Sequence, residues 1–271
     1  MSTEFELTAS VLGESPHPDW LTDRAAHALE GVDDTTLDEI RLLRDDFARF
    51  MMPYKFGIDE VNTKISILRE EFSQLHDYNP IEHVSSRLKT PESIVAKVVR
   101  KECDPSFDAI GATIMDIAGV RVTCSFSSDV YRVFELLTGQ SDIRLVTAKD
   151  YIAHPKPNGY KSLHAIVEVP VFLSAGPKPV FVEVQIRTVA MDFWASLEHK
   201  IYYKYDRAVP QDLLDELKEA AETASRLDAK MERLHSEIRG AVEPNEPRLA
   251  LVPGDDTLQQ FHEARQQFSD V

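Results

Sequence analysis

Hydrophobic residues recur every three or four positions in two stretches near the start of the chain. The first stretch runs from Leu37 to Phe50 and the second from Ile58 to Leu75. This spacing predicts two amphipathic helices, each with one apolar stripe. Pro53 lies between them, and a proline removes a backbone donor from a helix interior. We therefore expect the first helix to end at Pro53 and both helices to be scaffold.

Four more stretches have helical spacing: the residues after Thr90-Pro91, the range 127–139, the range 190–201 and the residues beyond Pro210. The helix over 190–201 is expected to turn inward Ala190, Phe193, Trp194, Leu197 and Ile201. The last helix has an apolar seam with steps of three and four, formed by Leu213, Leu217, Ala220, Ala224, Leu227, Met231, Leu234 and Ile238. Such a seam packs either on helices of its own domain or on another subunit, and both alternatives stay open.

Alternating polar and apolar positions predict strands in the middle of the chain. β-Branched residues favour a strand within 114–126, and a short strand is expected over 143–146. From Tyr160 onward, the polar residues Tyr160, Ser162 and His164 fall on one face, opposite apolar residues. Helices around a small mixed sheet, with a long helix near the C-terminus, predict an α+β fold.

The chain has 271 residues, of which 43% are hydrophobic and 28% charged, and this composition is typical of a globular protein. We expect one domain over residues 35–240. Before it, residues 1–34 are expected to be a flexible acidic leader, and after it residues 241–271 an irregular tail. Short helices are predicted near 20–29 in the leader and near 257–268 in the tail.

The net charge of −16 limits the partners of the chain. An acidic protein repels nucleic acid over most of its surface, so its charge does not indicate an RNA partner, and an anionic ligand needs a local basic cluster. No run approaches the ~20 apolar residues that cross a bilayer, and no secretory signal is recognisable. Cys103 and Cys124 lack the spacing of metal ligands. We expect a soluble, cytoplasmic protein with reduced thiols and no membrane partner.

A basic cluster surrounds the predicted start of the helix at Thr90-Pro91. Between residues 87 and 101 the only acid is Glu92, against five bases: Arg87, Lys89, Lys97, Arg100 and Lys101. The free amides at the start of a helix attract anions, and here they coincide with the positive charges. The cluster therefore favours a polyphosphate site over a merely solvated basic face.

A rigid turn is predicted over residues 155–159, because its two prolines fix the backbone and Asn158-Gly159 accepts positive φ. Around this turn lie the phenol ring of Tyr160, the imidazole of His164 and several lysines. Such groups stack on a purine and contact its phosphates. A hairpin whose polar face simply meets water is the alternative.

Two carboxylates complete the candidate chemistry. Asp116 stands at the head of the strand predicted within 114–126. Glu183 lies in a second alternating stretch, where Glu183, Gln185 and Arg187 share one face. Two acids near a basic helix entrance can hold a divalent cation between phosphate oxygens. Together these groups predict a phosphoryl-transfer site, although an outward polar face would show the same alternation.

Four motifs resemble the synthetase domain of the RelA/SpoT family, and most closely its stand-alone members, the small alarmone synthetases. They are SRLK, DIAGVR, KDYIAHPKPNGYKSLH and VEVQIRTVAMDFWASLEHKIYYK, in this order. The resemblance covers about residues 35–240. It implies a nucleotidyltransferase-like core that transfers the β,γ-pyrophosphate of ATP to the 3′-hydroxyl of GDP or GTP and releases AMP.

The resemblance also implies roles for individual residues. It assigns ATP binding to Arg87, Lys89, Ser93, Lys97 and Arg121. It assigns GDP or GTP binding to Lys156, Asn158, Tyr160, His164 and Gln185, with Tyr160 stacking on guanine. It assigns catalysis and Mg²⁺ binding to Asp116 and Glu183, with Glu183 either helping to hold the metal or taking the proton from the 3′-hydroxyl.

Other implications concern specificity and assembly. Thr147 stands where many long members of the family have an arginine, so the preference between GDP and GTP stays open. We expect no alarmone hydrolysis, since the residues before the scaffold helices are too few for a hydrolase domain. The resemblance implies a homo-oligomer, a tetramer. Two alternatives remain: a catalytically silent nucleotide- or RNA-binding regulator of the same fold, and a structural oligomer built on the seam over 213–238.

Overall fold

The structure is a computed structural model that describes residues 34–76, 78–204 and 210–241. The chain divides into two compact units, residues 1–49 and 50–271. The described part of the first unit is the beginning of helix α2 (Asp34–Leu75). The second unit contains the rest of α2 and all the other elements. The helices predicted near 20–29 and 257–268 lie outside the described residues.

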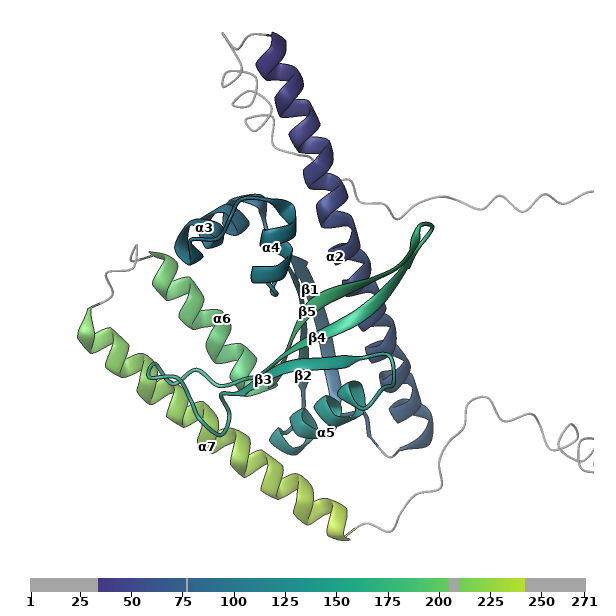
Figure 1. Cartoon of the computed structure of the whole chain (residues 1–271). Helices are drawn as coiled ribbons and strands as arrows, with labels where there is room; N and C mark the ends of the chain where they lie inside the picture. Colours follow the sequence, from purple (N-terminus) through teal and green to yellow (C-terminus); the bar gives the residue numbers. More distant parts are fainter. Residues whose placement is uncertain (1–33, 77, 205–209, 242–271) are drawn as a thin grey trace, which may run out of the picture. The chain divides into compact units, whose positions relative to one another are not determined.

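After α2, the described part of the chain forms five strands, with two helices between β1 and β2, one between β2 and β3, and two after β5 (Figure 1). In chain order they are β1 (Ile81–Leu88), α3 (Pro91–Lys101), α4 (Phe107–Thr113), β2 (Ala118–Cys124), α5 (Ser127–Thr138), β3 (Arg144–Asp150), β4 (Leu163–Leu173), β5 (Gly176–Thr188), α6 (Val189–Lys204) and α7 (Gln211–Ala241). None of the described helices combines the length and apolar composition that crossing a bilayer requires.

The five strands form one sheet in the order β1-β2-β5-β4-β3. β2 and β5 run parallel, while the other neighbouring pairs are antiparallel. The sheet is therefore mixed, and the predicted α+β class is confirmed. On its apolar face Val120, Val122, Val182 and Val184 are at most 1% exposed. That burial fixes the register, because a shift by one residue would turn these side chains to the opposite face.

Helix α2 covers part of the apolar face through its second half. At Gly57 a Cβ atom would lie 2.8 Å from Val180 and 3.2 Å from Val182, so the helix approaches β5 closely. Further along α2, Val61 and Ile65 are fully buried. The opposite face of the central strands carries the polar residues of the candidate site.

The predicted helix end at Pro53 is wrong. α2 continues through Pro53 to Leu75. A proline inside a helix removes one hydrogen bond, but Tyr54, Ile58 and the buried residues after them gain apolar contacts only if the helix continues. Packing thus outweighs the local signal.

Several other boundaries differ from the prediction. β1 and α4 were not predicted as elements, and β2 begins at Ala118 rather than near residue 114. β4 begins at Leu163, and Ser162 is fully buried, with its hydroxyl donating to the Ile186 carbonyl at 3.2 Å. Ser162 therefore does not share an open face with its polar neighbours. The predicted helix over 127–139 and the cap at Thr90 are confirmed.

Helices α6 and α7 lie side by side (Figure 1). Trp194 of α6 is 6% exposed, and its indole nitrogen donates to the Leu217 carbonyl of α7 at 2.9 Å. The inward prediction is wrong for Phe193 and Leu197, which are 65% and 41% exposed, because α7 packs on the side of Trp194. The seam of α7 is largely uncovered among the described residues: Leu227, Met231, Leu234 and Ile238 are all exposed.

Candidate functional site

Asp116 and two lysines form the centre of the basic cluster. Asp116 precedes β2, Lys89 follows β1, and Lys97 lies on α3. The Asp116 Oδ2 atom is 2.6 Å from Lys97 Nζ and 3.2 Å from Lys89 Nζ. The backbone amide of Lys89 donates to the Ile117 carbonyl at 2.8 Å and so holds the lysine beside the acid. Three segments that are separate in the sequence thus meet at one carboxylate.

The environment of Asp116 keeps it ionised. Burial acts to raise the pKa of the carboxyl, but the hydrogen bond from Lys97 and the charge of Lys89 outweigh burial, so the pKa is lower than usual. The Oδ1 atom is buried and has no hydrogen-bond partner among the described residues. Since buried carboxylate oxygens normally have partners, this atom is a candidate ligand for an ion or a polar group that binds here.

The start of α3 faces the same cluster. The hydroxyl of Thr90 accepts a hydrogen bond from the Ser93 amide at 3.3 Å and donates to the Ser93 hydroxyl at 3.0 Å. Pro91 occupies the first turn, as the sequence predicted. Ser93 therefore lies in the first turn of α3, at the positive end of the helix dipole, and Lys97 lies one turn later.

Arg87 and Arg121 line a separate hollow of about 110 Å³ on the polar face of β1 and β2. Arg87 pairs with Gly119 in the sheet register, and the Arg87 stem packs over Gly119, with its Cγ atom 3.7 Å from the position that a Cβ atom would take there. Gln185 of β5 also lines this hollow. The structure therefore brings the two arginines together, as a pair flanking a flat ring requires.

Glu183 lies on β5, next to β2, and each of its carboxylate oxygens has a side-chain partner. His164 Nδ1 is 3.3 Å from Glu183 Oε1, and the Gln185 amide donates to Glu183 Oε2 at 2.9 Å. The Tyr160 hydroxyl is 2.8 Å from the other imidazole nitrogen. Tyr160, His164, Glu183 and Gln185 thus form one connected group.

Opposing effects set the pKa of Glu183. Burial of the carboxyl raises its pKa, and the nearby charge of Asp116 raises it slightly. The hydrogen bonds with His164 and Gln185 lower the pKa by more than these two effects raise it, so the pKa lies below its usual value. For Tyr160, burial raises the pKa of the phenol, so the phenol keeps its proton. The site therefore pairs ionised carboxylates with a neutral aromatic hydroxyl.

The turn before β4 is ordered by its own side chains. Asn158 donates to Glu198 of α6 at 3.0 Å and accepts from the Tyr160 amide at 3.2 Å. Lys156 Nζ lies 4.6 Å from the centre of the Tyr160 ring and 4.7 Å from that of the Tyr151 ring, at cation–π distance. The amide of Asn158 is therefore engaged within the protein, whereas the Lys156 ammonium lies over the aromatic rings.

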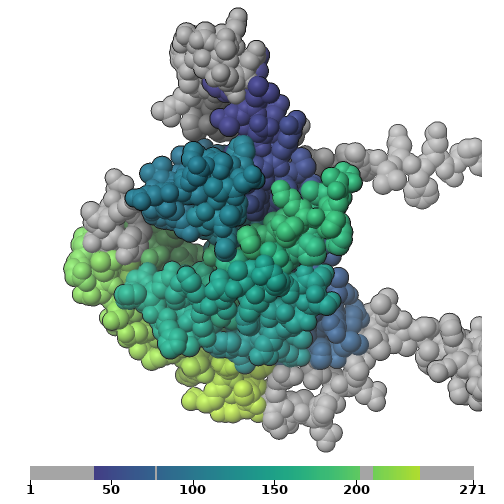
Figure 2. All heavy atoms as spheres, viewed as in Figure 1, coloured from purple at the N-terminus to yellow at the C-terminus, as the bar shows by residue number. Residues whose placement is uncertain are grey.

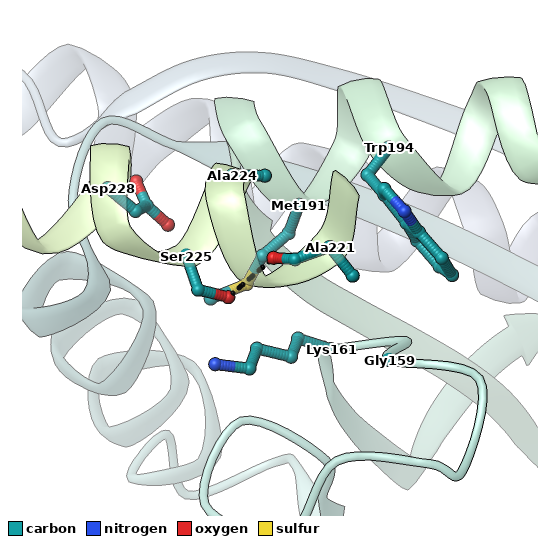
Figure 3. A pocket seen from close by; sticks show the side chains of 8 residues that line it. All are labelled: Gly159, Lys161, Met191, Trp194, Ala221, Ala224, Ser225 and Asp228. Atoms are coloured by element: carbon teal, nitrogen blue, oxygen red, sulfur yellow. Dashed lines mark hydrogen bonds between the residues drawn. The ribbon is translucent and has the colours of Figure 1, made fainter. Parts of the chain in front are cut away.

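The other side of this turn rests on α7. Gly159 has φ +88° and faces Ala221, while Lys161 points toward Ser225 and Asp228 (Figure 3). A larger hollow of about 410 Å³ runs along the same contact.

The surface view shows α3 and α4 beside the central part of the chain that contains the sheet, with a notch between the helices and the sheet (Figure 2).

The two halves of the site lie on adjacent strands. β2 and β5 pair in parallel, with Gly119 opposite Glu183 and Arg121 opposite Gln185. The charge of Asp116 acts on Glu183, so the two carboxylates are within electrostatic reach of one another. No group of three or more candidate metal ligands occurs among the described residues, so a cation here would need oxygen atoms from its substrate.

Two functional candidates were missed. Arg187 is only 2% exposed and donates to Tyr160, Gln185 and Asp192. Asp192 of α6 also accepts from Arg121 at 3.5 Å. The alternation along β5 placed Arg187 on the polar face, which was a usable signal. Nothing in the pattern of α6 pointed to Asp192.

Comparisons with known proteins give a consistent result. The family described as "Region found in RelA / SpoT proteins" matches residues 86–208. The chain is 50% identical over 204 residues to the GTP pyrophosphokinase YwaC of Bacillus subtilis, which covers 75% of this chain and 97% of the relative. It is 41% identical over 195 residues to the GTP pyrophosphokinase YjbM of the same organism, which covers 72% of this chain and 89% of the relative.

Solved structures agree with these matches. Small alarmone synthetase 2 of Bacillus subtilis has a TM-score of 0.65 at 52% identity, covering 71% of this chain and 99% of its own. Small alarmone synthetase 1 of Bacillus subtilis, bound to its product pppGpp, has a TM-score of 0.65 at 40% identity, covering 73% of this chain and 98% of its own. The similarity therefore extends over almost the full length of these relatives.

Proposed function

Since the chain belongs to the RelA/SpoT family and is similar to its small alarmone synthetases, we propose that it is a (p)ppGpp synthetase, a GTP pyrophosphokinase. It transfers the β,γ-pyrophosphate of ATP to the 3′-hydroxyl of GDP or GTP, which gives ppGpp or pppGpp and AMP. The observation that supports this most directly is Asp116, which lies just before β2, the strand next to that of Glu183. Two lysines hold its carboxylate, and one of its oxygens has no partner among the described residues.

ATP binds on the side of β1 and α3. Lys89 and Lys97 neutralise the triphosphate, and Ser93 offers a hydroxyl at the start of α3, where the helix dipole favours anions. Arg87 and Arg121 hold the adenine ring between their planar guanidinium groups in the hollow that they line. Transfer of this kind depends mainly on positioning and on neutralising charge, and these residues supply both.

The carboxylates fit a divalent cation, which we propose is Mg²⁺. Mg²⁺ prefers oxygen ligands and is commonly held by one or two carboxylates together with substrate phosphates. Asp116 has a buried oxygen without a partner in the described part of the chain, and the pKa values of both Asp116 and Glu183 lie below their usual values, so both are available as anions. When bound, the ion would neutralise negative charge that develops on the transferred phosphates.

The acceptor nucleotide binds on the side of the turn and β4. The Tyr160 ring stacks on guanine, and Lys156, Asn158, His164 and Gln185 surround it. The 3′-oxygen of the acceptor attacks the β-phosphorus of ATP, and the bond from that phosphorus to the oxygen of AMP breaks. Glu183 receives the hydroxyl proton, because its carboxylate is ionised and held by two hydrogen bonds.

The test is a product assay with γ-labelled ATP, Mg²⁺, and GDP or GTP in parallel. We expect label in guanosine tetraphosphate or pentaphosphate, with AMP in equal amount. Glu183→Gln should lower the rate at least about 100-fold, as removal of a general base typically does. Glu168→Gln is the matched control, since Glu168 lies on β4 and pairs with Arg144 outside the site. Absence of labelled product from the wild-type protein would refute the function.

We also propose that the chain forms a homo-oligomer through α6 and α7. A groove of about 1010 Å³ beside these helices is lined by the exposed apolar residues Phe193, Leu227 and Met231, together with acids such as Glu216 and Glu219. Exposed apolar patches of this kind mark association surfaces. A second copy of the chain is the partner proposed here, as the resemblance to small alarmone synthetases implies.

Sedimentation at several concentrations tests the assembly. Leu227→Asp should shift the protein toward a monomer, because a charge is costly to bury in an apolar contact. Phe172→Asp is the control, since Phe172 is 74% exposed on β4, away from the groove. A wild-type protein that sediments as a monomer at every concentration would exclude the assembly.

A further inference from the structure

Arg187 is a buried cation that the proposed mechanism does not use. Its NH2 nitrogen donates to the Tyr160 hydroxyl at 3.1 Å and to Gln185 Oε1 at 2.6 Å, while NH1 donates to Asp192 at 3.2 Å. We propose that Arg187 is a positioning residue that fixes the direction of two hydrogen-bond chains ending on Glu183. The inference rests on the proposed function only for the role of Glu183 as the acceptor of the hydroxyl proton.

The first chain passes through Tyr160 and His164. An arginine has only donors, so the Tyr160 oxygen accepts from Arg187 and its single proton is left for His164 Nε2, 2.8 Å away. Nε2 is then an acceptor, and the proton of the neutral imidazole lies on Nδ1. Nδ1 faces Glu183 Oε1 at 3.3 Å and donates to it.

The second chain passes through Gln185. Its carbonyl oxygen accepts from Arg187, so its NH₂ group points the other way and donates to Glu183 Oε2 at 2.9 Å. One guanidinium therefore orders a donor onto each oxygen of the Glu183 carboxylate. Without the Arg187 guanidinium, the His164 imidazole can take its other tautomer and the Gln185 side-chain amide can flip. Either change places an acceptor lone pair, instead of an N–H group, next to the Glu183 carboxylate.

Arg187 is itself held in place from α6. Asp192 binds its NH1 group and also accepts from Arg121, which lines the hollow proposed for adenine. Because the Arg187 side chain is almost completely buried, its guanidinium cannot exchange these partners for water. Replacing Arg187 should therefore change the position of the Glu183 carboxylate and leave the exposed side chains of the site in place.

The direct test is the tautomer of His164 in protein without metal or nucleotide. Histidine is labelled with ¹⁵N, and side-chain ¹⁵N–¹H correlation spectra are recorded at about pH 8.5, where an ordinary imidazole is neutral. The His164 signals are assigned by their loss in His164→Gln. We expect the proton on Nδ1 in the wild type and a mixture of tautomers in Arg187→Met and in Tyr160→Phe. This readout does not depend on activity, so it stands even if synthetase activity is absent.

Kinetics give the second readout. Arg187→Met should lower kcat about 10- to 100-fold, as loss of groups that orient active-site ligands typically does. The KM for ATP should change less than about twofold, and Arg187→Lys should regain part of kcat because one ammonium can replace only some of the bonds. Arg144→Met is the control, since Arg144 bonds only Glu168 among the described residues, on β4.

The outcomes separate cleanly. An Nδ1 proton in the wild type that is lost in Arg187→Met, with the fall in kcat, supports the inference. An Nε2 proton in the wild type overturns it, as does an Arg187→Met protein that keeps both the tautomer and kcat. If Arg187→Met does not fold, the wild-type tautomer and Tyr160→Phe still decide the question.

Discussion

Gly159→Ala should disturb acceptor binding through the contact between the turn and α7. Gly159 has φ +88°, a conformation that side chains disfavour, and a Cβ atom there would lie 2.6 Å from the Ala221 Cβ atom. Ordinary contact between carbon atoms needs roughly 3.5–4.0 Å, so the turn and α7 would have to separate by about 1 Å. Since Tyr160 is the next residue, its ring would move with the turn.

The magnitude follows from two separate penalties. Positive φ costs a non-glycine residue about 1–2 kcal/mol, and overpacking costs about 1–3 kcal/mol. Gly159→Ala should therefore destabilise the protein by about 2–5 kcal/mol in urea unfolding. Gly176→Ala is the matched control, because Gly176 has φ +118° but nothing within 4 Å of its Cβ position, so only the backbone penalty applies.

Kinetics then show whether the movement reaches the site. The KM for GTP should rise about tenfold in Gly159→Ala, corresponding to about 1.4 kcal/mol, while the KM for ATP stays within about twofold. A second substitution, Ala221→Gly, removes the contacting methyl group and should restore much of the loss. The reasoning would be refuted if Gly159→Ala were no more destabilising than Gly176→Ala, or if both KM values rose together.

Three further predictions concern charge and thiols. Lys97→Met should raise the KM for ATP at least about tenfold, measured by initial rates, because it would remove the charge-assisted hydrogen bond that we propose Lys97 makes to phosphate. The hydrogen bond from Lys64 lowers the pKa of Asp142, so this carboxylate stabilises the fold above its unfolded pKa of about 3.9 and loses that effect as the pH falls through its folded pKa. Asp142→Asn should thus cost less than about 1 kcal/mol near pH 7 in thermal unfolding, since the Asp142 side chain is 48% exposed, and this cost should shrink as the pH falls below about 3.9. Burial raises the pKa of the Cys124 thiol, so a disulfide reagent should modify only Cys103 in the native protein and both thiols in denaturant.

Much of the site could be predicted because its signals are local. Alternation placed Glu183, Gln185 and Arg187 on one face of a strand, and β5 has this pattern. The cap at Thr90 and the proline after it marked the start of α3. These features depend on a few neighbouring residues and on the steric preferences of the backbone, so sequence alone is sufficient to find them.

Other features depend on contacts between distant residues. α2 continues through Pro53 because residues on its later turns are buried against the sheet, a gain that the proline itself does not signal. The exposure of Phe193 follows from which side of α6 is covered by α7. Asp192 was missed for the same reason, since its partners Arg121 and Arg187 lie on two strands. Periodicity gives the faces of an element but not which face meets which neighbour.

The passage from β5 to α6 has no connecting residue, since the strand ends at Thr188 and the helix begins at Val189. A single residue inserted at this joint would rotate the helix by about 100°, because a helical turn takes about 3.6 residues. Asp192 would then swing away from Arg187, and Glu198 away from Asn158. We therefore expect this joint to have the same length in every active relative.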